Sequence, residues 1–362
     1  DGDAEQRGGW GKGVSLPLLR IAVGPHAAMS SAPARLRSLL ARPGCHLMPC
    51  CFDPLSARLV EASGFPVTFA SGFSVAAAHG LPDTGLLSYG EMEHAMRRIT
   101  GSLKAVPCIG DGDTGYGNAV NAKRTVAGYA RAGLAGIMIE DQVSPKRCGH
   151  TQGKAVVDRA AATARVRAAV DAARETAGSA DDAIVVMART DAAATHGLDE
   201  ALYRAQAFRD AGAARSAEIQ PGRNRDPAER GGRIPARERA RGLCAVRLSP
   251  GADILFVEAP RSVEELRRVC SEASGVPHMA NLLQGGLTPV LSQSELAELG
   301  FKLAAYPLDL LNATIAAQRR TLEALKATGQ PSPGDTLPFG ELTAFVGFDE
   351  YNAEAERYST GE

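Results

Sequence analysis

Short apolar runs recur along the chain from residue 46 onward, and polar stretches with helix-forming composition lie between them. Apolar runs of this length, bounded by turn residues, are typical of strands buried in a parallel sheet. We expect strands at residues 47–52, 67–70, 106–109, 136–139, 184–188, 254–257, 278–282 and 302–306. The helices expected to follow them are residues 54–63, 89–102, 119–132, 158–176, 199–211, 262–273, 292–299 and 308–327.

This alternation of strands and helices predicts an α/β fold, a parallel (β/α)8 barrel of the TIM type with a C-terminal helical extension. An open, doubly wound sheet is the alternative. It is less favoured because no Gly-x-Gly-x-x-Gly motif opens the first unit. We expect the catalytic barrel to span residues 35–330, and the C-terminal tail, residues 331–362, to pack on the barrel or on a neighbouring subunit.

Residues 214–252 interrupt the rhythm with nine arginines, several glycines and prolines, and almost no apolar period. Removing them would join the end of one helix directly to the start of the next strand. Because a structureless loop of this length is uncommon inside a compact barrel, we interpret the segment as a disordered surface insertion or an artefact of the gene model. The functional alternative is a basic arm that binds an anionic partner.

Residues 1–34 have no usable period, and we interpret them as a disordered leader. Acidic residues are absent from residues 14–42, where arginines alternate with Ser, Ala and Leu. This composition is typical of an organellar transit peptide, which would direct the protein to a chloroplast or a mitochondrion. The alternative is a cytoplasmic protein that starts at Met29, just before an amphipathic first helix.

Composition narrows the class of protein further. The net charge of −1 gives no general reason to expect binding to nucleic acid or to a membrane surface. No apolar run approaches the roughly 18 residues of a membrane-spanning helix, so we expect a soluble protein. The seven cysteines are odd in number and scattered, which disfavours a disulfide framework. Without a suitable CxxC spacing, a zinc site is not expected either.

Polar residues follow the expected strands at the end where parallel-barrel enzymes carry their active sites. Asp111 and Asp113 come after the third strand, with one glycine between them. Their carboxylates suit Mg²⁺ or Mn²⁺, and Glu140 and Glu258 are expected on the same rim. The alternative is an Asp-Gly turn that holds no ligand.

Arg189 leaves the fifth apolar strand, where an isolated cation would be costly to bury. Its guanidinium could bind a substrate carboxylate through two parallel hydrogen bonds. The alternative is an ion pair with Glu140, Asp191 or Glu258, and such a pair is compatible with substrate binding.

The loop after the fourth strand reads Lys146-Arg147-Cys148-Gly149-His150. A thiol among cations can exchange a proton or act as a nucleophile. The alternative, a buried structural thiol, fits these polar neighbours poorly. We therefore expect an acid–base or nucleophilic role for Cys148, with His150 orienting the loop or contacting the substrate. The other six cysteines lie in apolar or irregular segments, and we expect no catalytic role for them.

Three motifs resemble those of the isocitrate lyase/phosphoenolpyruvate mutase superfamily, namely residues 111–118 (Asp-Gly-Asp-Thr-Gly-Tyr-Gly-Asn), 146–150 and 188–192 (Ala-Arg-Thr-Asp-Ala). The resemblance runs from about residue 36 to residue 358, apart from residues 214–252. It is nearest to the plant-type petal death protein/carboxyvinyl-carboxyphosphonate phosphorylmutase branch and to the methylisocitrate lyases. It implies a barrel whose last helix swaps between the subunits of a homotetramer.

The resemblance also implies a set of site residues. Mg²⁺, or Mn²⁺, would be held near Asp83, Asp111, Asp113 and Glu140. A small diacid substrate would be bound by Ser71, Gly72, Phe73, Gly149, His150, Arg189, Glu258 and Asn281. The catalytic residues would be Glu140, Lys146, Cys148, His150 and Arg189.

Family chemistry passes through a metal-bound enolate of a 2-oxo acid, and in the lyases the cysteine protonates the departing fragment. Cys148 therefore favours a carbon–carbon lyase that cleaves a small 2-hydroxy dicarboxylate of the 2-alkylmalate or methylisocitrate type. An oxaloacetate hydrolase forming oxalate and acetate is the second hypothesis, and a phosphonate-forming phosphoryl mutase is the third. The non-enzyme alternative is an inactive barrel subunit.

Two departures from the family pattern bear on the substrate. Gln284 stands where relatives commonly carry Glu, and Asn312 falls where methylisocitrate lyases place an arginine. Loss of that charge disfavours a tricarboxylate and favours a smaller diacid, such as a 2-alkylmalate or oxaloacetate.

Overall fold

The computed structural model of the protein describes residues 30–149, 153–211 and 251–359. Residues 1–29 of the expected leader, His150 and residues 214–250 of the expected insertion lie outside the described residues. The chain divides into two compact units, of which the first ends at Leu308 and the second is Asp309–Glu362.

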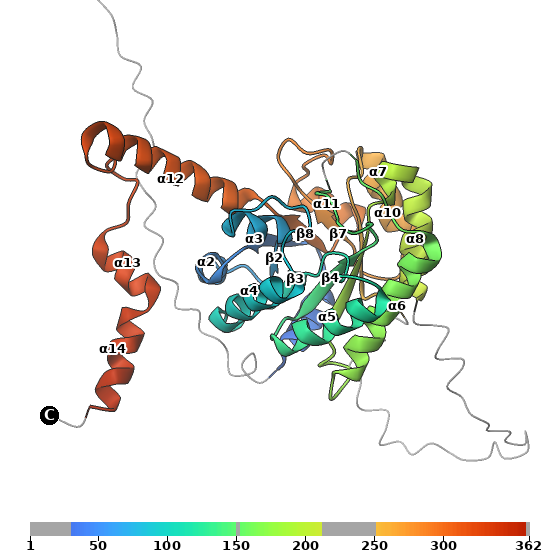
Figure 1. The fold of residues 1–362 in the computed structure, drawn as a ribbon, viewed down its shortest axis with the longest axis horizontal. Coiled ribbons are helices and arrows are strands. Elements are labelled where there is room, and N and C mark those ends of the chain that lie inside the picture. The colour runs from blue at the N-terminus through green and yellow to red at the C-terminus, as the bar shows by residue number, and fades with distance from the viewer. Residues whose placement is uncertain (1–29, 150–152, 212–250, 360–362) are drawn as a thin grey trace, which may run out of the picture. The chain divides into compact units, whose positions relative to one another are not determined.

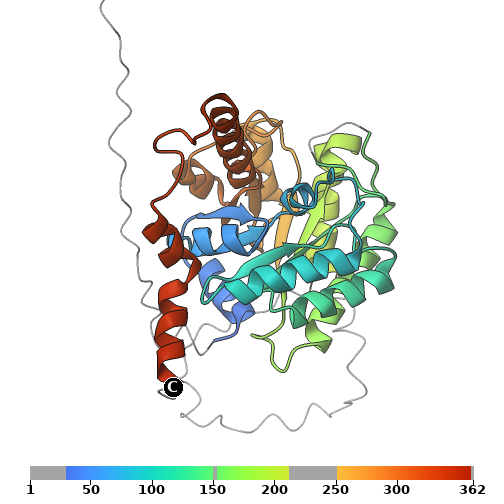
Figure 2. The same cartoon turned by 60° about the vertical axis from the view of Figure 1, so that its left-hand side comes forward.

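Among the described residues, eight parallel strands form one sheet: β1 (His46–Cys51), β2 (Thr68–Ala70), β3 (Cys108–Asp111), β4 (Gly136–Glu140), β5 (Val185–Thr190), β6 (Ile254–Val257), β7 (Met279–Asn281) and β8 (Leu303–Tyr306). Their order is β6-β5-β4-β3-β2-β1-β8-β7, and a parallel bridge between Leu255 and His278 joins the two edges. The sheet is a nearly closed barrel surrounded by helices (Figure 1, Figure 2). The predicted (β/α)8 fold is confirmed.

The helices of this unit begin where the sequence provides side chains that satisfy the first backbone N–H groups. The helices are α1 (Ala32–Leu40), α2 (Pro54–Ala62), α3 (Gly72–Ala78), α4 (Tyr89–Ser102), α5 (Ala119–Arg131), α6 (Arg159–Glu175), α7 (Ala192–His196), α8 (Leu198–Asp210), α10 (Val263–Glu272) and α11 (Gln293–Leu299). Five of them, α2, α4, α5, α6 and α11, are capped in this way by Asp53, Ser88, Asn118, Asp158 and Ser292.

Two strands differ from their expected bounds in ways that matter for the site. β3 begins at Cys108 rather than at residue 106 and extends to Asp111, which pairs with Met138. β5 extends beyond residue 188, so that Arg189 pairs with Phe256 of β6. Polar residues at a strand end carry no apolar signal, and pairing with the neighbouring strand decides their conformation. The helices α3 and α7 were not expected, because seven and five residues are too few to show a helical period.

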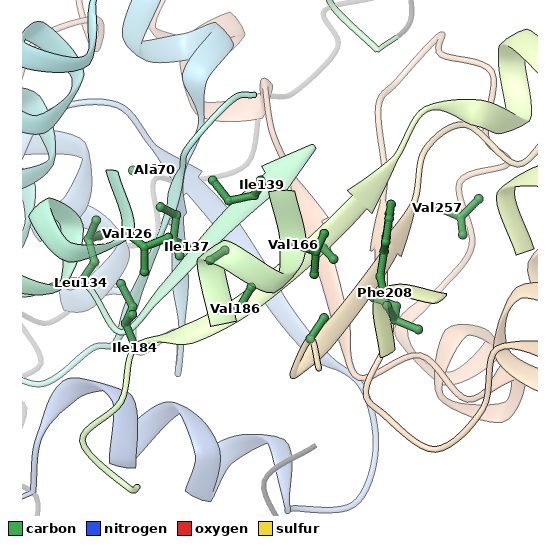
Figure 3. Packing of buried hydrophobic residues seen from close by; sticks show 14 of the residues in the cluster. Ala70, Val126, Leu134, Ile137, Ile139, Val166, Ile184, Val186, Phe208 and Val257 are labelled. Atoms are coloured by element: carbon green, nitrogen blue, oxygen red, sulfur yellow. The ribbon is translucent and has the colours of Figure 1, made fainter. Parts of the chain in front are cut away.

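Alternation of side chains along the strands divides the core into two layers. In β4, Ile137 belongs to the outer layer between sheet and helices, together with Val126 of α5, whereas Met138 belongs to the inner layer. Figure 3 shows Ile137 and Val126 within the outer layer. Leu36 of α1 is fully buried in the inner layer and faces Gly136, the first residue of β4. α1 therefore covers the end of the barrel at which the strands begin.

The second unit consists of α12 (Asp309–Thr328), α13 (Phe339–Val346) and α14 (Phe348–Arg357). None of the side chains in these three helices is buried. In the division into compact units α12 groups with the tail, after Leu308. The expected extent of the catalytic barrel, to residue 330, stays a prediction. No helix in the described ranges combines the length and the apolar character of a membrane span.

The two ends of the expected insertion lie against each other. Gly251 and Ala252 are described and buried, so the barrel resumes at residue 251, two residues before the expected position 253. Ala252 N–H donates to the Phe208 carbonyl at 3.0 Å. A Cβ placed on Gly251 would lie 2.3 Å from the Arg209 carbonyl oxygen and 2.7 Å from Ala211 N. The intervening residues therefore leave and return at one point of the barrel.

We predict that a linker of two or three Gly and Ser residues can replace residues 212–250 without loss of the fold, because connections between helices and strands commonly have this length. The midpoint of thermal unfolding should change by less than about 3 °C. Gly251→Val is the matched control, because its side chain would meet backbone atoms of α8, and it should lower the midpoint. Failure of the shortened chain to fold would contradict the prediction.

Candidate active site

The carboxyl ends of the strands meet at one rim of the barrel, where a cavity opens. Because β4 pairs in register with β5, Glu140 and Arg189 are neighbours in the sheet. The residues named from the sequence that line this cavity are Ser71, Phe73, Asp83, Asp111, Lys146, Cys148, Gly149, Arg189, Glu258 and Asn281. The remaining ones, Gly72, Asp113 and Glu140, contact members of this lining. The sequence therefore identified residues that the fold brings together, while His150 lies outside the described residues.

One side of the cavity is acidic. Asp111 accepts hydrogen bonds from the backbone N–H groups of Gly72 and Asp113, both at 3.0 Å. Lys146 Nζ lies 2.5 Å from Asp83 Oδ1 and 2.7 Å from Asp113 Oδ1. Burial and the charge of Asp113 raise the pKa of Asp111 to about 6. Burial opposes the charge of Lys146, but the surrounding carboxylates, Asp113 first, raise its pKa well above the usual value.

The acidic side fits a divalent cation of the Mg²⁺ type. Asp113 Oδ1 and Glu140 Oε1 are buried without a hydrogen bond, although the former lies near Lys146 Nζ in a poorly aligned ion pair. Burial raises the pKa of Glu140 well above its ordinary range, and the charge of Arg189 offsets only part of this effect. Within the described ranges, no three His, Cys, Asp or Glu side chains are arranged to hold a metal by themselves. An all-oxygen site with few protein ligands suits Mg²⁺ or Mn²⁺, which keep waters and bind substrate oxygens.

The groups at the start of α3 position the acidic side. Ser71 Oγ accepts a hydrogen bond from Ser74 N–H at 3.4 Å and thereby caps the helix. Gly72 N–H holds Asp111, so in this structure that N–H serves a protein carboxylate. Contact of Ser71 and Gly72 with a substrate carboxylate stays a prediction. Phe73, the next residue, is half-buried at the cavity wall.

Arg189 provides the fixed positive charge of the opposite side. Its Nε and Nη2 atoms donate to the two carboxylate oxygens of Asp191 at 2.8 and 3.0 Å. Nη2 also lies 2.9 Å from Glu258 Oε2, and Nε lies 3.3 Å from Glu140 Oε2. Burial opposes the charge of Arg189, but these carboxylates, Asp191 first, raise its pKa well above the usual value. The ion pair left open by the sequence therefore forms with all of the proposed partners.

The loop after β4 brings Cys148 to the cavity. Its start is fixed by the Gln142 side chain, which donates to the Arg147 carbonyl at 2.9 Å and accepts from Arg147 N–H at 3.0 Å. Cys148 is half-buried, and both it and Gly149 line the cavity. A Cβ on Gly149 would lie 2.5 Å from Arg189 Nη2, so a side chain at this position would collide with the guanidinium.

Two residues that the sequence did not single out also belong to the site. Tyr116 adopts a φ of 59° and donates its hydroxyl to Asp113 Oδ2 at 3.0 Å. Lys154 donates to the Gly149 carbonyl and lies 3.3 Å from Asp191 Oδ1. A lone lysine in a polar loop looks like a solvated charge in the sequence, and only its burial in the fold reveals otherwise. Tyr116 lies within the motif at residues 111–118, which was the available signal.

The site can be compared with known proteins. The family model for phosphoenolpyruvate phosphomutase matches residues 36–220. The chain is 37% identical to the petal death protein of Dianthus caryophyllus, over 91% of this chain and 87% of that protein. It is 32% identical to 2,3-dimethylmalate lyase of Eubacterium barkeri, over 91% of this chain and 98% of that protein.

A solved structure is also similar to this chain. Oxaloacetate acetylhydrolase in complex with 3,3-difluorooxalacetate superposes with a TM-score of 0.75 at 28% identity, over 92% of this chain and 99% of that chain. The match in sequence covers nearly the whole chain, and the match in structure covers the barrel that carries the site. The chain belongs to the phosphoenolpyruvate mutase/isocitrate lyase superfamily.

Proposed function

We propose that the protein is a carbon–carbon lyase, dependent on Mg²⁺ or Mn²⁺, that cleaves a 2-alkylmalate-type 2-hydroxy dicarboxylate into a 2-oxo acid and a second carboxylic acid. The observation that carries this proposal is the position of Cys148. Cys148 lines the same cavity as Asp111 and Arg189. A proton donor, an acidic side suited to a metal and a fixed cation are the groups that such a cleavage requires.

The chain's own residues account for binding and charge. Arg189 keeps its charge beside the carboxylates that surround it, and its guanidinium is the cation available to the carboxylate end of the substrate. Asp111 and Asp113 would hold the cation, with Asp83 and Glu140 close by. When bound, the cation would stabilise negative charge that develops on the substrate's oxygens. Lys146 lies against the same carboxylates and ties the loop to them.

The reaction balances with these groups. The substrate hydroxyl gives its proton to a carboxylate of the acidic side, and the bond between C2 and C3 breaks. C2 becomes the carbonyl carbon of the 2-oxo acid, while the electron pair of the broken bond stays with C3. Cys148 then gives its thiol proton to C3, which completes the second carboxylic acid. The loop that carries Cys148 lines the cavity, and its closure over the substrate would keep water from protonating C3 instead.

The apolar part of the cavity supports an alkyl-substituted substrate. Phe73, Leu283 and Pro307 line the cavity beside the charged groups. Apolar walls of this kind suit methyl or other alkyl groups and discourage a third carboxylate, which would be buried without a partner. The similarity to 2,3-dimethylmalate lyase agrees with this choice. Asn312 is exposed in the second unit and does not line this cavity, so its part in substrate choice stays a prediction.

Oxaloacetate hydrolysis is the second candidate, favoured by the similarity to oxaloacetate acetylhydrolase. The same scaffold would then direct water at the substrate carbonyl, with oxalate and acetate as the products. Product analysis separates the two activities, because the lyase forms a 2-oxo acid from a malate derivative and the hydrolase does not.

We predict that Cys148→Ala lowers kcat by about 10²–10⁴-fold, the range for loss of a general acid, while KM changes little. The measurement is 2-oxo acid formation from a panel of 2-alkylmalates in the presence of Mg²⁺. Cys270→Ala is the matched control, because Cys270 is half-buried outside this cavity, and it should retain activity within about twofold. Unchanged activity of Cys148→Ala, or no product from any of these substrates, would refute the lyase proposal.

The pKa of Asp111 gives a prediction for the metal-free protein. Because burial raises this pKa to about 6, the folded chain keeps a proton that the unfolded chain has lost above about pH 4. Stability of the wild type relative to Asp111→Asn should therefore fall as the pH rises from about 4 to 7, by roughly 2 kcal/mol. Urea unfolding across this range measures the difference.

Mg²⁺ should reduce this loss of stability in the wild type, because it binds the ionised carboxylate. Asp181→Asn, which removes an exposed carboxylate, serves as the control. A difference between wild type and Asp111→Asn that does not vary with pH would contradict the assignment of a raised pKa to Asp111.

We also propose that the second unit joins copies of this chain in a homotetramer. Its helices expose large apolar side chains, among them Leu322 at 63%, Phe339 at 80% and Tyr351 at 71%. Exposed apolar groups at this density are typical of association surfaces. The chain should therefore elute with a mass near four times 37.8 kDa in light-scattering measurements. Phe339→Asp should lower that mass, whereas Val120→Asp on the exposed face of α5 should leave it unchanged. A wild-type monomer would rule out the assembly.

A further inference from the structure

Lys154 is a buried lysine outside the motifs that define the site. Its side chain is 3% exposed. A lysine ammonium is rarely buried without an anion, because removal from water is costly. Here Nζ lies 3.3 Å from Asp191 Oδ1 and donates a hydrogen bond to the Gly149 carbonyl. The ammonium thus joins a side chain at the end of β5 to the backbone of the cysteine loop.

The anchor for this ammonium is itself fixed. Asp191 is fully buried, and its carboxylate receives both hydrogen bonds from Arg189. Asp191 N–H donates to Asp141 Oδ1 at 2.9 Å, which holds the backbone of Asp191 in place. Lys154 and Arg189 therefore share one carboxylate whose position the barrel determines.

Gly149, the other partner of Lys154, is held from two directions. Its Cα lies so close to the ion pair of Arg189 and Glu258 that a Cβ would be 2.5 Å from Nη2 and 2.6 Å from Oε2. Its carbonyl receives the hydrogen bond from Lys154 on another side. Because Cys148 is the preceding residue, the place of Gly149 determines where the thiol can lie.

The loop has a second anchor at its start. The Gln142 side chain makes two hydrogen bonds with the backbone of Arg147, at 2.9 and 3.0 Å. Cys148 lies between this anchor and the contact of Lys154 with Gly149. The segment that carries Lys154 is itself placed by the barrel, since Val143 N–H donates to the Ala155 carbonyl at 2.9 Å. Loss of the ammonium would leave Gly149 with its close approach to Arg189 and Glu258.

We propose that Lys154 is a positioning residue that docks the Cys148–Gly149 end of the loop onto Asp191 and so holds the thiol in the cavity. The proposal rests on the proposed function in so far as it takes Cys148 to be the proton donor. Lys154 acts through the loop backbone and does not line the cavity, so it is not assigned any contact with the substrate. A simpler role, neutralising Asp191, would instead alter Arg189 and thereby the affinity for substrate.

The first test measures the position of the thiol without any substrate. Lys154→Met keeps the length and the apolar stem of the side chain and removes the ammonium. Alkylation of Cys148 by iodoacetamide, followed by peptide mass spectrometry, should become several-fold faster than in the wild type, because the released loop exposes the thiol. Lys123→Met is the control, since Lys123 forms an exposed ion pair with Glu175 elsewhere, and its Cys148 should react at the wild-type rate.

The second test uses the reaction. Lys154→Met should lower kcat by about 10²-fold, as expected for a reacting group displaced by roughly 1 Å, while KM changes by less than about threefold. In the Cys148→Ala background the same substitution should have little further effect, because both changes remove the same step. Lys154→Arg retains donors for Gly149 and should restore part of the activity.

The outcomes are separable. An unchanged rate of Cys148 alkylation in folded Lys154→Met, checked by circular dichroism and thermal unfolding, would overturn the proposal. A rise in KM with unchanged kcat would also overturn it and assign Lys154 to neutralising Asp191. If the wild type cleaves no malate derivative, the proposed function fails, whereas the alkylation experiment still decides whether Lys154 docks the loop.

Discussion

Arg189 carries a positive charge into the interior of the barrel rim, and the arrangement of the site follows from the need to balance it. A buried guanidinium is stable when anions surround it and its hydrogen bonds are satisfied. Glu140 from β4, Asp191 from the end of β5 and Glu258 after β6 meet this need. Because these residues come from consecutive strands of the sheet, the ion pairs fix the ends of those strands relative to one another. Gly149 packs closely against Arg189 and Glu258 of this cluster.

Carboxylates also outnumber cations on the opposite side of the cavity. Lys146 from the loop supplies part of the positive charge there. Burial, and then the charge of Asp113, raise the pKa of Asp111 at this side of the cavity. Asp113, one of the carboxylates proposed to hold a divalent cation, also pairs with the loop lysine. A cation bound at Asp113 would therefore compete with Lys146 and so act on the position of the loop.

Much of this arrangement could be predicted from the sequence, because parallel strands deliver their carboxyl ends to one rim. Asp111, Arg189 and Glu258 were placed together on that argument, and the fold brings them together. The bounds of β3 and β5 were less accurate, since polar terminal residues join a strand through pairing with its neighbours. Lys154 could not be found in this way. Its role depends on burial, and burial depends on a loop whose path has no periodic signal.

Some alternatives were also decided by geometry alone. The sequence allowed Arg189 to bind substrate or to pair with protein carboxylates, and the distances show the pairing directly. The family resemblance assigned Gly72 to substrate binding, but in this structure its N–H group donates to Asp111. In both cases the residue type was informative, whereas the partner depended on contacts between distant parts of the chain.

The contact between the two ends of the segment after α8 has a practical consequence. The connection from α8 to β6 lies at the end of the barrel where strands begin, and the catalytic rim lies at the other end. Since the chain departs from and rejoins the barrel at adjacent positions, additional polypeptide can be accommodated there without stretching the sheet. The junction between Ala211 and Gly251 is thus an attachment point, suited to an affinity tag, a fluorescent domain or a scaffold-binding module that must not obstruct the catalytic rim.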